Sequence, residues 1–468
     1  MKRREFITTT TLLASGTAAA SLARAAPPAM TVPASSPDPA PARPARRPNI
    51  VVVIADDTTP GYHGCYGGPT PTPHIDALAR AGLRMERGYC CASLCSPSRY
   101  NLFTGQYTQR SAANLKGPAG EPALVSQTGE LEIGQMTLAR LLREAGYFTG
   151  HFGKWHTRFN MDGFDFPPVK LPEGDADDPA VDAELRLQHG RACEVVRRCA
   201  GFEVADRTFW GNIDAKKKID PRLYAHNPAW ITDGALQFLD EALAQPGRPF
   251  YLHVANTVPH TPDCHLSLGK DHRYTWGGKL DHAPRSHPDD STVFARLRAA
   301  NLPVEGPFAG VNAGQIMIDD QIGALVARLE AAGQLDNTLF IYLADHGLPG
   351  KGSCHHTGQH LPCVMRWPVG GLPAGRTLGE VFSWVHFAPT VAEACRASFP
   401  SDCTVDGTSV LEAITACAGP WPAPVAYHEM GWSRSVIKGR YHYIATRYPG
   451  EAIAQMQAGD HTRAGTGI

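Results

Sequence analysis

Two pairs of polar residues stand directly behind apolar runs of the sequence. The runs NIVVVIA (49–55) and TLFIYLA (338–344) are each followed by such a pair, Asp56 and Asp57 in the first case and Asp345 and His346 in the second. Continuous β-branched runs are typical of strands covered on both faces, so these pairs are expected at the carboxyl edge of a sheet. Carboxylates gathered at such an edge can hold a cation, whereas a single pair also serves as a loop or helix cap.

A lysine and two histidines occupy comparable positions. In the sequence GKWH, alternate residues of an extended segment point the same way, so Lys154 and His156 can face one site while Trp155 packs behind them. His260 follows a third strand-like run, PFYLHVA. A lone Lys or His is usually a solvated surface residue. Just beyond the strands of a parallel sheet, however, these side chains would face the edge where ligands bind.

Cys95 lies at a predicted helix start. Ser96 is a good N-cap and Pro97 suits the first helical position, which places residue 95 at a helix N-terminus. Exposed amides and the positive end of the helix dipole favour an anionic group there. Taken alone, Cys95 is equally consistent with a buried thiol in front of a capped helix.

The surrounding sequence predicts how these residues are positioned. Helical periodicity alternates with extended runs and is found at residues 74–83, 135–146, 228–245 and 312–335. This alternation predicts an α/β fold with a large, mostly parallel or mixed central sheet flanked by helices. Residues 157–227 are polar and poorly periodic, and we expect them to form an excursion over the site's rim. From residue 425 onward, short strand-like segments predict a small C-terminal antiparallel subdomain.

Several of these motifs together resemble the type I, formylglycine-dependent sulfatases of the alkaline phosphatase superfamily. CSPSR followed by LFTGQ (95–106) resembles the family's maturation signature, and the resemblance extends from residue 47 to about 375 through the segments RPNIVVVIADD, GKWH, PHTP and ADHG. It implies that a maturation enzyme oxidises Cys95 to formylglycine. It also implies that calcium, which prefers hard oxygen ligands, is bound by Asp56, Asp57, Cys95, Asp345 and His346. Asparagine is more familiar at position 346; an imidazole can ligate through nitrogen, hold a water or favour a softer ion.

The resemblance further implies a reaction, the hydrolysis of sulfate monoesters by an arylsulfatase-like enzyme, with a sulfated small molecule or carbohydrate as substrate. One hydroxyl of hydrated residue 95 attacks sulfur with Asp345 as base, and His260 protonates the leaving alcohol. His156 then deprotonates the second hydroxyl, so that sulfate leaves and the aldehyde returns. The sulfate oxygens are neutralised by Arg99, Lys154 and Lys351, the last of which aligns on a less regular loop.

The N-terminus predicts export. Residues 1–25 read as a twin-arginine-type signal peptide containing Arg3 and Arg4, and residues 26–47 read as a Pro/Ala-rich tether. A catalytic domain is expected at 48–418 and the C-terminal subdomain at 419–468, in a periplasmic or secreted protein. A net charge of -1 gives no support for nucleic-acid binding, and no apolar segment is long enough for stable membrane insertion.

Three alternatives remain open at this point. A formylglycine-dependent phosphonate or phosphodiester hydrolase would use the same scaffold and nucleophile. A non-catalytic sulfoglycan-binding relative would lack Cys95, a carboxylate or a lysine. A separate transition-metal site would use a cluster of suitable ligand types, Cys354, His355, His356 and His360. The twelve cysteines of an exported chain also predict buried thiols with a few disulfides.

Overall fold

The computed structural model describes residues 46–115, 123–159, 169–213, 218–285, 290–306, 309–416 and 420–459. All of them belong to one compact unit. The predicted signal peptide and nearly all of the predicted tether lie outside the described residues. Within the described ranges, no helix is both long and apolar enough to cross a membrane.

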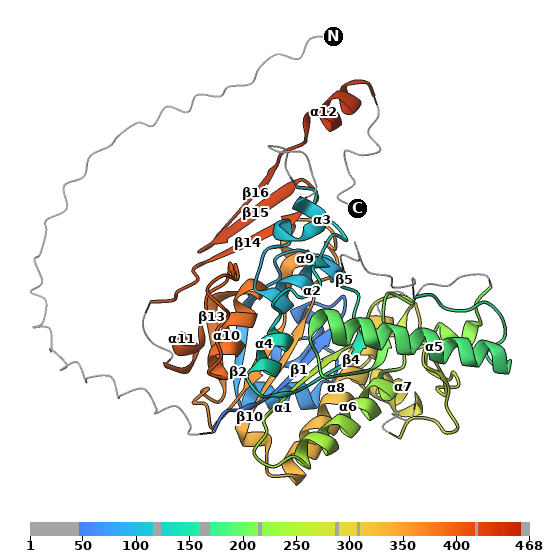
Figure 1. Ribbon diagram of the computed structural model, residues 1–468. Helices are drawn as coiled ribbons and strands as arrows, with labels where there is room; N and C mark the ends of the chain where they lie inside the picture. The colour runs from blue at the N-terminus through green and yellow to red at the C-terminus, as the bar shows by residue number, and fades with distance from the viewer. Residues whose placement is uncertain are drawn as a thin grey trace, which may run out of the picture. The chain divides into compact units, whose positions relative to one another are not determined.

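A mixed sheet of nine strands forms the centre of the described part of the chain, in the order β11-β2-β12-β10-β1-β7-β4-β6 with β13 paired to β2 (Figure 1). Its middle is parallel and comprises β10 (Thr338–Ala344), β1 (Asn49–Ala55), β7 (Phe250–Ala255), β4 (Phe148–Lys154) and β6 (Val204–Phe209). Its other half is mostly antiparallel and comprises β12 (Cys363–Arg366), β2 (Leu83–Tyr89), β11 (His360–Leu361) and β13 (Arg376–Ser383).

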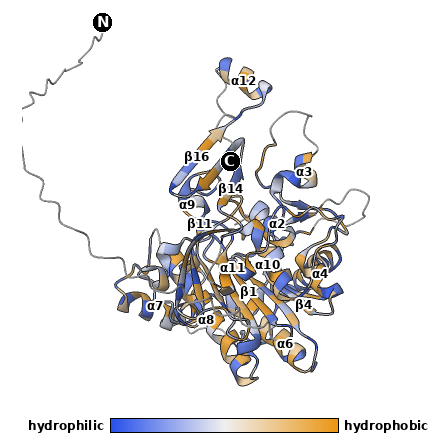
Figure 2. Ribbon diagram, turned by 90° about the vertical axis from the view of Figure 1, so that its left-hand side faces the viewer, coloured by the Kyte–Doolittle hydropathy of each residue, from blue (hydrophilic) through white to orange (hydrophobic). Residues whose placement is uncertain are grey.

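The central strands are buried on both sides, as their sequences predict. Every residue of β1 and β10 is buried, and Figure 2 shows the hydrophobic colour of β1 in the interior. Along β4, Phe148 and Phe152 contact Phe238, with ring centroids 4.7 and 5.8 Å apart, whereas His151 points the other way and stacks on His253 at 5.1 Å. This alternation is the pattern of a strand with a helical layer on each face.

Two groups of helices provide these layers. One group contains α6 (Pro228–Leu243), which carries Phe238, with α8 (Ala309–Ala331) and α1 (Pro73–Arg80). The other contains α2 (Cys95–Thr104), whose Phe103 contacts His253 at 5.0 Å, with α4 (Leu138–Glu144) and α10 (Phe387–Ala394). The predicted α/β class is thereby confirmed. Further elements are α3 (Ala112–Leu115), β3 (Glu130–Leu131), β5 (Arg158–Phe159), β8 (Tyr274–Thr275), β9 (Gly278–Lys279), α7 (Asp290–Ala299), α9 (His356–Gln359) and α11 (Leu411–Ala416).

Residues 157–227 are more regular than their sequence suggests. They contain the helix α5 (Pro179–Val195) and the strand β6, which pairs with β4 and extends the central sheet. The description of the whole segment as an excursion over the rim was therefore wrong. Only four residues of α5 are buried, Leu185, Gln188, Ala192 and Cys193, so the helix carries little hydrophobic periodicity.

The predicted C-terminal antiparallel sheet is present. It consists of β14 (Val425–Met430), β15 (Ser433–Lys438) and β16 (Tyr441–Thr446), and α12 (Gly450–Gln457) follows it. The backbone amide of Glu429 in β14 donates to the carbonyl oxygen of Cys91 at 2.8 Å. The C-terminal sheet therefore supports the segment that leads into Cys95, while the domain boundary at residues 418 and 419 stays a prediction.

The disulfides expected from the sequence are absent among the described cysteines. The eleven cysteines in the described ranges are all free thiols, so no disulfide forms among them. Cys354 is buried in a small apolar cluster with Leu94 and Met430. Among the described residues, the groups of side chains close enough to share a metal ion do not include Cys354, His355, His356 or His360. The described residues therefore give no support to a transition-metal site at this cluster.

Candidate active site

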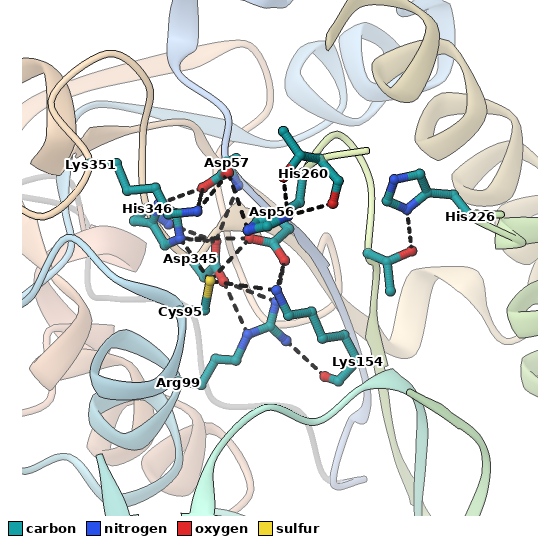
Figure 3. A network of polar contacts seen from close by, with 12 residues as sticks. Asp56, Asp57, Cys95, Arg99, Lys154, His226, His260, Asp345, His346 and Lys351 are labelled. Carbon is teal, nitrogen blue, oxygen red and sulfur yellow. Dashed lines mark hydrogen bonds and ion pairs between the residues drawn. The ribbon is translucent and has the colours of Figure 1, made fainter. Parts of the chain in front are cut away.

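The parallel strands bring the two polar pairs together. Ala55 and Ala344 end β1 and β10 in register, so Asp56 and Asp345 follow side by side, and the amide of Asp345 donates to the carbonyl oxygen of Ala55 at 3.0 Å. Asp56, Asp57, Asp345 and His346 are at most 3% exposed. Figure 3 shows them converging on one point near the sheet edge.

Cys95 meets this cluster from the start of α2. Its sulfur lies 3.5 Å from an Asp56 carboxylate oxygen, 3.1 Å from His346 Nε2 and 3.5 Å from Lys154 Nζ. The helix begins at Cys95 itself, after Leu94, so the expected N-cap role of Ser96 was wrong: the Ser96 hydroxyl donates to the Gly129 carbonyl. The expected placement of Cys95 at a helix N-terminus is confirmed.

Three buried carboxylates are matched by three side-chain cations from different elements. Arg99 donates from Nε to Asp345 Oδ2 at 3.0 Å, and its Nη2 forms an ion pair with the same oxygen at 2.9 Å. Lys154 pairs with Asp56, and Lys351 contacts both oxygens of Asp57 at 2.9 and 2.8 Å. Buried charges are tolerated when they are paired and hydrogen-bonded, so each cation offsets much of the desolvation cost of its carboxylate.

The two histidines have oppositely shifted pKa values. Burial lowers the pKa of His156, and the sulfur of Cys95, which accepts a hydrogen bond from it, offsets this shift only in part. Burial also acts to lower the pKa of His260, but Asp56 and the hydrogen bond to Cys95 outweigh it and raise the pKa. A lowered pKa favours the neutral imidazole that a general base needs, and a raised pKa favours the protonated imidazole that a general acid needs.

The surroundings also prepare residue 95 and Asp345 for chemistry. Burial acts to raise the pKa of Cys95, but the charges of Lys154 and His346 outweigh it and hold this pKa well below its ordinary value. Burial, together with the neighbouring Asp56 carboxylate, raises the pKa of Asp345 to about 6. Lys154 and His346 thus stabilise a negative charge on the side chain of residue 95, including one that develops during a reaction.

The donor set fits a cation. Ligand atoms of Asp56, Cys95, Asp345 and His346 lie within 4.8 Å of one another, and those of Asp56, Asp57 and His260 form an overlapping group. Calcium takes oxygen ligands at about 2.3–2.6 Å, so ligands on opposite sides of one ion are separated by nearly 5 Å. The five predicted metal ligands thus converge, although His346 offers a nitrogen and Asp57 belongs to the second group.

Backbone conformation helps to aim these side chains. Asp57 and His156 have φ values of 62° and 54°, a left-handed conformation that non-glycine residues rarely adopt. Gly153, with φ 97°, precedes Lys154, and a Cβ atom there would lie 1.9 Å from the Ala255 carbonyl oxygen. Only glycine therefore lets β4 approach β7 closely enough to deliver Lys154 and His156 to the site.

His226, which supports the loop carrying His260, was not predicted from the sequence. His226 is fully buried, its Nδ1 lies 2.8 Å from Thr257 Oγ1 and its Nε2 lies 2.7 Å from the Pro262 carbonyl oxygen (Figure 3). It thereby fixes both ends of the loop that carries His260. Burial lowers the pKa of His226 to about 4, so it remains neutral. No motif or spacing around residue 226 signals this role.

Replacing Arg99 tests the charge balance. Arg99→Met should lower the free energy of unfolding by about 3 kcal/mol, because it leaves Asp345 buried and unpaired, and adding Asp345→Asn should recover part of this loss. Arg110→Met is the control: Arg110 pairs with Asp406 at 2.7 Å but is 47% exposed, so it should cost less than about 1 kcal/mol. Denaturant unfolding with a chelator present measures the free energy of unfolding of both variants. Equal losses for Arg99→Met and Arg110→Met would contradict the conclusion that Arg99 compensates the buried charge of Asp345.

Comparisons with known proteins agree with this geometry. The sequence profile of the Sulfatase family matches residues 48–396. Mouse steryl-sulfatase is 30% identical over 433 residues, which cover 80% of this chain and 66% of that protein. The N-acetylglucosamine-6-O-sulfatase of Bacteroides thetaiotaomicron is 25% identical over 465 residues, which cover 89% and 77%.

A solved structure shares the fold. The phosphonate monoester hydrolase of Agrobacterium radiobacter superposes with a TM-score of 0.53 at 18% identity, covering 86% of this chain and 87% of that one. At this identity the likeness concerns architecture alone. The family match spans most of the chain and includes all ten side chains that the sequence predicts for the site. The chain therefore belongs to the sulfatase family, the type I sulfatases of the alkaline phosphatase superfamily, which are sulfuric ester hydrolases.

Proposed function

We propose that the protein hydrolyses sulfate monoesters through a formylglycine hydrate derived from Cys95. The observation that carries this proposal is the buried position of Cys95 Sγ at the start of α2, between the carboxylates and Lys154 and hydrogen-bonded to His156 and His260. The sulfur marks the place of the two hydroxyl oxygens that a hydrated aldehyde would carry. A maturation enzyme is the partner that would carry out the oxidation of Cys95.

The side chains divide the work of the reaction. Lys154, Lys351 and Arg99 neutralise the sulfate oxygens while charge moves toward the leaving alcohol. Asp345, with its raised pKa, accepts the proton of the attacking hydroxyl. His260, whose pKa is raised, donates to the alcohol oxygen, and His156, whose pKa is lowered, removes the proton of the second hydroxyl so that sulfate is expelled.

Calcium is the proposed cation of the site. The three carboxylates supply the oxygen ligands that calcium prefers, and His346 would coordinate the ion beside them through a ring nitrogen. When bound, the ion would polarise the sulfate group and favour the ionised nucleophile. A sulfated carbohydrate is the proposed substrate class, supported by the N-acetylglucosamine-6-O-sulfatase among the relatives.

Two rival functions are less well supported. A phosphonate or phosphodiester hydrolase shares the architecture, but the relatives aligned over most of the chain are sulfatases. A non-catalytic binding protein has no use for a reactive residue placed between an acid and a base. Here Cys95, the three carboxylates and Lys154 are buried together, and the partly exposed Lys351 contacts Asp57.

Parallel assays test the proposed function. Matured enzyme should release sulfate from sulfated glycan fragments or aryl sulfates much faster than phosphate or phosphonate from the matching esters. Cys95→Ala should be inactive, while Cys95→Ser, with one hydroxyl, should accumulate a covalent sulfate ester on Ser that releases very slowly. Cys403→Ser, outside the site, serves as the control. Faster phosphonate hydrolysis, or full turnover by Cys95→Ser, would refute the proposal.

Metal removal tests the cation. A chelator should abolish turnover, and Ca²⁺ should restore it and raise the melting temperature, because an ion that binds only the folded protein stabilises it. His346→Asn replaces nitrogen by oxygen and should preserve the response to Ca²⁺ while weakening that to Zn²⁺. Restoration by Zn²⁺ but not by Ca²⁺ would overturn the calcium assignment.

Export by a twin-arginine signal is the proposed route to a periplasmic or secreted location. Replacing both Arg3 and Arg4 by lysine should leave the protein in the cytoplasm, because this pathway requires the arginine pair. Fractionation of the native host, with immunodetection of the protein, measures the outcome. Undiminished export of the double-lysine variant would exclude this signal type.

A further inference from the structure

A cavity of about 580 Å³ lies one strand further along the sheet from the site. Trp210, in its wall, directly follows Phe209, the last residue of β6, which is in register with Lys154. The Phe209 carbonyl accepts a hydrogen bond from the amide of Trp155 at 2.8 Å. Because neighbouring strands lie about 4.8 Å apart, Trp210 leaves the sheet beside the segment that carries Lys154 and His156.

Two indole rings form the fixed part of the cavity wall. Trp276 is 3% exposed, donates from Nε1 to the Leu223 carbonyl at 3.1 Å and packs against Phe209 with ring centroids 5.0 Å apart. Trp210 packs against Trp276 at 4.6 Å. The aromatic surface is thus held in place before any ligand arrives, which reduces the entropy cost of binding.

Polar groups stand around this aromatic wall. The Asn212 side chain lines the cavity, and its carbonyl oxygen is buried with no hydrogen-bond partner among the described residues. A buried acceptor without a partner is unfavourable, so a change in the Asn212 rotamer that exposes this oxygen to a ligand hydroxyl would favour binding. Lys170 and Lys218 also line the cavity, and Glu173 pairs with Lys218 at 3.3 Å, which leaves a net positive charge among these three.

We infer that this cavity, lined by Lys170, Trp210, Asn212, Lys218 and Trp276, binds the sugar ring next to the sulfated unit of an anionic oligosaccharide. A pyranose ring presents an apolar C–H face, which suits an indole, and hydroxyl groups, which suit Asn212. A sulfate or carboxylate on that ring would meet the lysines. An apolar aglycone would leave the Asn212 oxygen and the lysine charge unused. The inference rests on the proposed function and narrows its substrate class to oligosaccharides.

Gly211 provides the test, because it lines the cavity and a Cβ atom added there would meet no other atom within 4 Å. Gly211→Leu should fill the cavity while the fold is kept. Its kcat/KM should fall about tenfold, mainly through KM, for size-fractionated tetrasaccharides from heparin, chondroitin sulfate or carrageenan. It should be unchanged for an aryl sulfate. Gly379→Leu, at an exposed β13 position that is equally open, is the matched control.

The outcomes separate the two claims. Asn212→Ala should reproduce the selective loss, and circular dichroism should show an intact fold for each variant. Wild-type activity on aryl sulfate but on none of the tetrasaccharides, or an equal loss on both substrates in folded Gly211→Leu, would overturn the sugar subsite and leave the sulfatase proposal intact. A larger loss on steryl sulfate than on tetrasaccharides would assign the cavity to an apolar aglycone and overturn the inference. Absence of sulfate release from any ester would refute the proposed function itself.

Discussion

The burial of three carboxylates around Cys95 is the constraint on which the site depends. Asp56, Asp57 and Asp345 are nearly inaccessible to water, so each needs a cation nearby. Arg99, Lys154 and Lys351 meet this need from α2, the end of β4 and the loop after β10. The three cations that stabilise the folded site can also bind an anionic sulfate group, and the three carboxylates can bind a metal ion.

The sheet topology brings these charged groups together. Parallel strands β10, β1, β7 and β4 lie side by side, so the residues after their carboxyl ends arrive at one edge although they are far apart in the sequence. Left-handed conformations at Asp57 and His156, and the close approach of β4 to β7 at Gly153, orient the side chains toward the site. The pKa values of His156 and His260 shift in opposite directions because of this placement.

The sequence predicted best where one strong physical signal acted alone. The bounds of β1 and β10 agree with their apolar runs, because strands buried on both faces need uninterrupted hydrophobic residues. The helix α5 and the strand β6 were missed, since a helix with four buried residues carries little periodicity. The convergence of Lys154, His156 and His260 was predicted from strand alternation and strand ends together with motif resemblance. The support that His226 gives to the His260 loop depends on contacts across 31 and 36 residues and had no local signal.

The chemical identity of residue 95 is the central claim of this account, since a geminal diol explains why an acid and a base both face one atom. Peptide mass spectrometry of active enzyme, produced in a host with a maturation system, measures it directly. We expect residue 95 to have lost sulfur and gained a carbonyl oxygen, while Cys90 and Cys91, which lie on the same tryptic peptide (88–99), keep their thiols. Full activity in enzyme whose Cys95 is still a thiol would contradict the account.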